Sequence, residues 1–303
     1  MKLRKWWAVA ALAIAAGAAI PAWAQTLYAA SVRTLAEGGS EAIGGSLYSV
    51  ELKTGSATLV APIRLNGSSP LGITGMAVHP TSGVMYGITS PLSRTNPLSL
   101  VIINPDTGNA QMVGPLRLAG SDIAFNRLGI LFTWLPETHQ LGVVNLETGN
   151  VTAIGNPGAA GPPAGLAIDA SNNAYITAKG ATGSVDTVDI ATGAIKVGPA
   201  LKGAPFDSTI NSMTFTPSGL LLAVNSNQGS PAATRLITIN VASGVVSNIG
   251  NLPDDTDALA FAVIPGKMEE QRMDWRTMAL YALFVIAVIL FLVGILSGRK
   301  PRN

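Results

Sequence analysis

The sequence predicts an all-β fold, a β-propeller of five blades, and three observations support this. A strand followed by a turn that ends in Thr-Gly or Ser-Gly occurs five times, with its glycine at Gly55, Gly108, Gly149, Gly193 and Gly244. A second phrase, with a small residue at its centre, also occurs five times. The glycine spacings of 53, 41, 44 and 51 residues match the repeat length of propeller blades. A propeller with another number of blades and a pair of open β-sandwiches are the alternatives.

The Thr-Gly phrase has a mechanical explanation as a hairpin turn. Its glycine can adopt the positive φ that short hairpin loops require. Each copy has an acid or an amide three residues before the Thr or Ser, namely Glu51, Asn104, Asn145, Asp189 and Asn240. Such side chains accept hydrogen bonds from the amides of their own turn. We therefore interpret these recurring oxygens as turn caps rather than as metal ligands.

The second phrase predicts the inner strand of each blade. Its five copies are 73–79, 121–126, 164–169, 211–216 and 257–261, and their central small residues are Ala77, Ala124, Ala167, Thr214 and Ala260. Small residues suit a crowded strand near a central axis. The first Thr-Gly unit has no inner strand before it, and the last inner strand has no blade after it. We expect the C-terminal strand to complete the N-terminal blade and close the ring, which removes free sheet edges.

The first 24 residues, Met1–Ala24, have the pattern of a signal peptide. Lys2, Arg4 and Lys5 precede an apolar run, and small residues at Ala22 and Ala24 predict cleavage before Gln25. An uncleaved anchor helix is the alternative.

The C-terminal region predicts one transmembrane helix. Residues 278–296 are nineteen residues without a charge, and a helix of that length spans about 28 Å, the thickness of a bilayer core. The tail, residues 297–303, contains three cations and no acid, which places it in the cytoplasm. Residues 25–266 are then an exported domain and residues 267–277 a juxtamembrane linker. We expect the chain in the inner (cytoplasmic) membrane, with its propeller in the periplasm or another extracytoplasmic space.

Composition excludes several classes of function. The chain has no cysteine, so disulfides, thiolate metal sites and a cysteine nucleophile are ruled out. Residues 25–266 contain ten Lys or Arg and fourteen Asp or Glu, a net charge of −4. A mildly acidic domain without a basic cluster does not favour nucleic acid as a partner. We expect no cofactor and no metal.

The repeats resemble a known group of proteins. The patterns "AF…G.LY" and "LY.ID..TG..T.IG" are similar to the bacterial secreted propellers of the broad YVTN/NHL-like repeat type, over essentially all of residues 25–265. Many members have no assigned activity, so the resemblance implies a fold rather than a reaction.

Polar residues at the starts of the inner strands are the candidate site. Thr74, Ser121, Asp122, Asn211, Ser212 and Asp257 are expected to converge on one mouth of the axial channel. The functional hypothesis is a ring that binds a small polar ligand or a cation, and the structural one is a set of strand caps with ordered water.

These observations favour a non-enzymatic, membrane-anchored binding or scaffolding module of the bacterial envelope, whose partner is an envelope protein or a glycan. Its support is a rigid frame without a recognisable catalytic set. The alternative is a hydrolase or lyase acting on a carbohydrate, with Asp122 and Asp257 as acid and base. Raised pKa values on these groups and a cleft of several hundred cubic ångströms would favour that alternative.

Overall fold

A computed structural model describes residues 23–32, 45–93, 95–159, 161–162, 164–178, 183–203, 209–227 and 233–268. Gln25–Pro265 form one compact unit. The described residues do not include the expected signal peptide up to Ala22, the linker beyond Met268, the expected transmembrane helix or the tail. The described ranges contain no helix that is long and apolar enough to cross a membrane.

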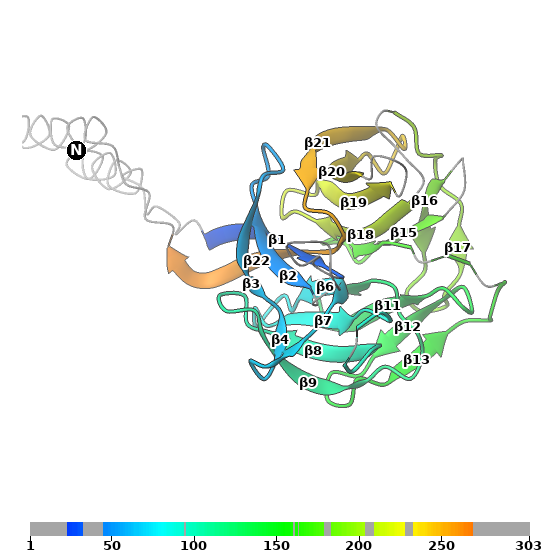
Figure 1. The fold of residues 1–303 in the computed structure, drawn as a ribbon. Coiled ribbons are helices and arrows are strands. Elements are labelled where there is room, and N and C mark those ends of the chain that lie inside the picture. The colour runs from blue at the N-terminus through cyan, green and yellow to red at the C-terminus, as the bar shows by residue number, and fades with distance from the viewer. Residues whose placement is uncertain are drawn as a thin grey trace, which may run out of the picture. The chain divides into compact units, whose positions relative to one another are not determined.

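The unit is a five-bladed propeller, as the repeats predicted, and Figure 1 shows its sheets arranged around a common centre. Three blades are plain four-stranded antiparallel sheets. From the inner edge outward, the third blade consists of β10 (Ile123–Phe125), β11 (Leu131–Leu135), β12 (Gln140–Val144) and β13 (Val151–Ile154). The fourth blade consists of β14 (Leu166–Ile168), β15 (Ala174–Ala178), β16 (Ser184–Val188) and β17 (Ile195–Lys196). The fifth blade consists of β18 (Thr209–Phe215), β19 (Leu221–Asn227), β20 (Ala233–Ile239) and β21 (Val246–Leu252).

The first blade contains strands from both ends of the unit. Its order is β22 (Thr256–Met268), β1 (Trp23–Ser31), β2 (Ser46–Val50) and β3 (Ala57–Pro62). The last strand in the described part of the chain is therefore the inner strand of the first blade. This arrangement confirms the expected closure of the ring by the C-terminal strand.

The second blade has two strands that the repeats did not predict. Its regular strands are β6 (Ile73–Val78), β7 (Met85–Thr89), β8 (Ser99–Ile103) and β9 (Asn109–Pro115), and the short hairpin β4 (Arg64–Leu65) and β5 (Ser69–Pro70) adds to the outer edge. Strand β4 runs parallel to β9. Because the hairpin belongs to the connection between blades rather than to the repeat, the periodicity gave no signal for it.

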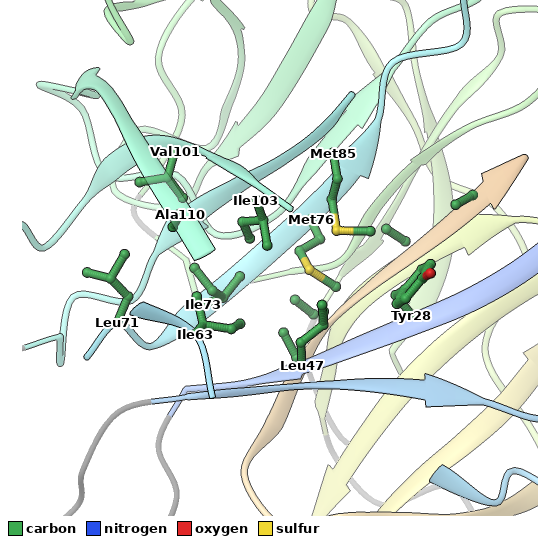
Figure 2. Packing of buried hydrophobic residues seen from close by; sticks show 14 residues of the cluster. Tyr28, Leu47, Ile63, Leu71, Ile73, Met76, Met85, Val101, Ile103 and Ala110 are labelled. Carbon is green, nitrogen blue, oxygen red and sulfur yellow. The ribbon is translucent and has the colours of Figure 1, made fainter. Parts of the chain in front are cut away.

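The apolar core is divided into five clusters, each between two neighbouring blades. Figure 2 shows the cluster between the first and second blades, where Leu47 and Tyr28 of the first blade face Met76, Met85 and other residues of the second. Since every blade buries both of its faces against neighbours, removing one blade would expose two of these clusters.

Each Thr-Gly or Ser-Gly turn contacts the preceding blade, and four of the five have the predicted side-chain cap. The turn amides of residues 106 and 107 donate to Asn104 Oδ1 at 2.9 and 3.1 Å, and the same pattern recurs at Asn145, Asp189 and Asn240. Glu51 differs from the prediction, since its Oε2 accepts from Thr54 Oγ1 at 2.7 Å. All five turn glycines have a positive φ. A Cβ on Gly149 would lie 2.4 Å from the carbonyl oxygen of Gly114 in the second blade. The glycine is therefore required by its φ and by the close approach of two blades.

We expect Gly149→Ala to destabilise the propeller more than Gly219→Ala. Both glycines have a positive φ, but a Cβ on Gly219 would have no atom within 4 Å. The backbone conformation alone costs about 1 to 2 kcal/mol for an L-residue, and Gly149→Ala adds the clash with the neighbouring blade. Thermal unfolding of the two variants measures the difference. Equal melting temperatures would show that the blades can separate without cost at this turn.

Candidate functional site

The carboxylate of Asp122 lies on the axis of the propeller and is fully buried just before β10. Its Oδ1 accepts from the amide of Ile123 at 2.9 Å and from Ser212 Oγ at 3.0 Å. Its Oδ2 accepts from the amides of Leu166 at 2.9 Å and Met213 at 3.0 Å. One side chain therefore joins the inner strands of the third, fourth and fifth blades.

The two remaining blades also contact this group. Ser212 Oγ accepts from the amide of Leu259 on β22 at 3.0 Å, so its hydroxyl hydrogen is directed to Asp122. A Cβ on Gly75 of β6 would lie 2.9 Å from the Cα of Asp122 and 3.1 Å from its Oδ1. All five inner strands thus meet at Asp122, either by hydrogen bonds or by close packing.

Burial raises the pKa of Asp122 well above the ordinary value of aspartate, whereas its hydrogen bonds act in the opposite direction. Three of its four partners are backbone N–H groups, which can only donate, and the fourth is the hydroxyl of Ser212, which donates here. These donors favour the ionised carboxylate, whereas burial favours the protonated acid.

Asp257 forms a second polar group near the starts of the inner strands. Its Oδ2 accepts from Thr74 Oγ1 at 2.5 Å and its Oδ1 from Asn211 Nδ2, which also donates to Ser226 Oγ at 2.9 Å. Asp257 on β22 is therefore joined to β6 of the second blade and β18 of the fifth. Its side chain is half-buried, and desolvation, with a smaller effect of Asp255, raises its pKa to about 6.

The six sequence-derived candidates thus separate into three hydrogen-bonded groups. Thr74, Asn211 and Asp257 form one, Asp122 and Ser212 form another, and Ser121 Oγ donates to the carbonyl of Ala164 at 2.9 Å. In all three groups the side chains bond to the protein itself. Only the Asp257 group includes half-buried side chains, those of Asp257 and Asn211.

A cavity of about 320 Å³ lies at the opposite ends of the inner strands. Its walls come from all five blades and include Met76, Ile123, Ile168, Met213 and the rings of Phe125, Phe215 and Phe261. Neither Asp122 nor Asp257 lines it.

Four of the five small central residues face this cavity. Ala77, Ala124, Ala167 and Thr214 line it. We expected small residues there because inner strands are crowded. Ala77, Ala124 and Ala167 also belong to the clusters between blades, so the cavity borders directly on the packed core.

The rim of the cavity is formed by four equivalent turns that the sequence reasoning missed. Each turn follows an inner strand and has a side-chain acceptor for its own amides, at His79 Nδ1, Asn126 Oδ1, Asp169 Oδ1 and Thr216 Oγ1. These residues all end the second repeated phrase, so the signal was present in the sequence. Arg127, next to Asn126, is exposed at the rim.

No protein-family model matches the chain, and no curated protein matches its sequence. Solved structures do resemble it. A chain in a crystal structure of a nidogen/laminin complex has a TM-score of 0.51 and 13% identity, over 79% of this chain and 98% of that chain. TolB from Acinetobacter baumannii has a TM-score of 0.48 and 14% identity, over 77% of this chain and 55% of its own. At such identities a likeness concerns the fold alone, and the class of protein is a β-propeller.

We expect Asp122→Asn to lower the free energy of unfolding by about 1 to 3 kcal/mol, because in either orientation the amide nitrogen would replace an oxygen that accepts at least one backbone N–H group. Chemical denaturation of the full chain in detergent measures this loss. Ser212→Ala is the milder comparison, since it removes one of the four donors. A change below about 1 kcal/mol for Asp122→Asn would mean that Asp122 is protonated in the folded protein.

The raised pKa of Asp257 predicts a pH-dependent stability. The folded protein binds this proton more tightly than the unfolded chain does, so the contribution of Asp257 to stability is greatest at low pH and is lost between about pH 4 and pH 6. A pKa of about 6 against an ordinary value near 4 corresponds to at most about 3 kcal/mol, and less because the group is half-buried.

Asp257→Asn should remove this dependence, because the amide oxygen still accepts from Asn211 and the Thr74 hydroxyl can accept instead of donate. The measurement is the unfolding free energy of both proteins between pH 4 and pH 8. We expect the unfolding free energy of the variant to increase relative to that of the parent as the pH rises. A constant difference between the two unfolding free energies across this pH range would contradict the raised pKa of Asp257.

Proposed function

We propose that this chain is a non-enzymatic binding module of the bacterial envelope, a propeller anchored by one C-terminal helix, and that its axial cavity is the binding site. The signal-like N-terminus and the apolar segment 278–296 support the anchored, extracytoplasmic location. The similarity of the repeats to secreted YVTN/NHL-like propellers supports a bacterial origin.

The single observation that carries the proposal is the cavity of about 320 Å³ formed jointly by all five inner strands. Small-molecule and anchoring sites are concave and mostly apolar, with a few polar groups at defined places. A closed ring holds such a site with little rearrangement, because the five interblade clusters fix the strands that line it.

The burial and hydrogen bonding of Asp122 support a binding role for this chain over a catalytic one. Glycoside hydrolysis requires two carboxyl groups about 5 to 9 Å apart that can reach a sugar bond. Both oxygens of Asp122 are occupied by protein donors, and its side chain is fully buried. Asp122 is therefore a structural residue in this proposal.

One observation favours the carbohydrate-active alternative. Asp257 is half-buried and has a pKa raised to about 6, in the range of a general acid. Burial is the main cause of the raised pKa, the Asp255 carboxylate adds a smaller effect, and the hydrogen bonds from Thr74 and Asn211 act in the opposite direction. Asp257 does not line the cavity.

Capture from a detergent-solubilised envelope tests the proposal with the full-length chain. We expect Thr214→Trp, which fills the cavity, to lose a protein or glycan that the parent retains. Leu59→Trp is the control, because Leu59 is 57% exposed on the outer strand β3. Mass spectrometry and glycan analysis identify what is bound.

Retention of the same partners by Thr214→Trp would exclude the cavity as the site. Release of reducing sugar from an envelope glycan by the parent, but not by Asp257→Asn, would instead establish the carbohydrate-active alternative.

A further inference from the structure

The side-chain acceptors of the four rim turns are used by the turns themselves. Asp169 is an example: its Oδ1 accepts the amides of Ser171 and Asn173 at 2.8 Å each, and its Oδ2 accepts Asn173 Nδ2 at 2.8 Å. The hydroxyl of Tyr175 is also hydrogen-bonded to this carboxylate. Among the described residues that line the cavity, Asp169 is the one acid, and its oxygens are therefore occupied by the protein.

The other turn caps follow the same rule. Asn126 Oδ1 accepts the amides of Leu128 and Ile130 at 3.0 and 2.9 Å, and His79 Nδ1 accepts those of Thr81 and Ser82. The groups that the turns leave unused are donors, but Asn126 is only 2% exposed and His79 Nε2 lies against Gly129 of the third blade. The exposed donor next to them is therefore Arg127.

Arg127 adds the positive charge at this rim. Its backbone amide donates to Asn172 Oδ1 of the fourth blade at 3.1 Å, which fixes the residue across the gap between two blades. Among the residues that the structure describes, no hydrogen bond or ion pair of its guanidinium is found. Arg127 can therefore offer its five N–H donors to a ligand.

The walls below the rim are apolar and aromatic. Phe125 packs edge-on against His79 and Tyr86, with ring centroids 5.0 and 5.5 Å apart. Phe215 packs on Tyr175 at 5.5 Å. Because these contacts hold the rings, the apolar walls have a defined shape before a ligand enters.

From this combination we infer that the cavity binds a small molecule with an apolar, preferably aromatic, body and one carboxylate, which Arg127 holds at the rim. The inference rests on the proposed function, since it assigns a ligand class to the same cavity. The carboxylate provides the acceptors that the rim lacks, and the ring occupies the volume that Ala77, Ala124, Ala167 and Thr214 line. The volume of about 320 Å³ is at the small end of ligand sites, which limits the body to one or two fused rings.

Titration calorimetry with 2-naphthoate and its neutral counterpart 2-naphthamide tests the inference on the full chain in detergent, with a detergent blank for each probe. We expect the parent to bind naphthoate about fivefold more tightly than naphthamide, a modest preference because Arg127 is exposed. Arg127→Gln should remove most of this preference, because it should weaken naphthoate binding more than naphthamide binding. Lys196→Gln is the matched control, since it deletes a cation on the outer strand β17 and should change neither affinity.

Thr214→Trp should abolish binding of both probes, and circular dichroism checks that the variant is folded. If Arg127→Gln leaves the preference for naphthoate intact, or if the parent does not distinguish the probes, the carboxylate assignment is wrong while the cavity remains a binding site. If a folded Thr214→Trp binds both probes as the parent does, the cavity itself is not the site, and the proposed function fails with it. Failure of both probes to bind the parent would overturn the ligand class.

Discussion

The arrangement of the inner strands depends on one buried carboxylate. The blades are separate sheets. Backbone hydrogen bonds such as that from Gly165 N–H to the carbonyl of Ile210 at 3.1 Å join neighbouring blades at single points, so side chains and turns must also fix the blades relative to one another. Asp122 accepts bonds from strands of three blades, reaches β22 through Ser212 and packs against Gly75 of β6. Its burial is costly, and that cost is offset only when all the strands are in place. The group therefore favours one assembled arrangement over partly assembled ones.

The two ends of the axis have different chemistry for the same geometric reason. Near the strand starts, polar side chains satisfy one another and fill the centre of the ring. Near the strand ends, Ala77, Ala124, Ala167 and Thr214 line a cavity together with the rings of Phe125, Phe215 and Phe261. The propeller is consequently closed by hydrogen bonds at one end and hollow at the other.

Much of the fold could be predicted from the sequence, because the same residue pattern recurs in each repeat and predicts the same turn and strands each time. The turn glycines, their Asn and Asp caps and the closure by residues 257–261 all follow from comparing copies. Asp122 could be recognised as a polar residue at a strand start, but not as the shared centre, since its partners Leu166, Ser212 and Met213 are 44 to 91 residues away. The cavity was missed because alanine at an inner position predicts close packing as readily as open space. Arg127 was missed because its exposed position in a turn gives no pattern.

The pairing of β22 with β1 has a consequence for how the ring is assembled. The first blade joins residues from both ends of the unit, so loop closure over more than 200 residues must precede the last sheet. Until then β1 presents an unpaired edge, and the clusters on both faces of the first blade are incomplete. A chain that enters a new compartment N-terminus first could not form the ring until its final strand arrived, and during that interval the open edge would be the surface most exposed to pairing with other chains.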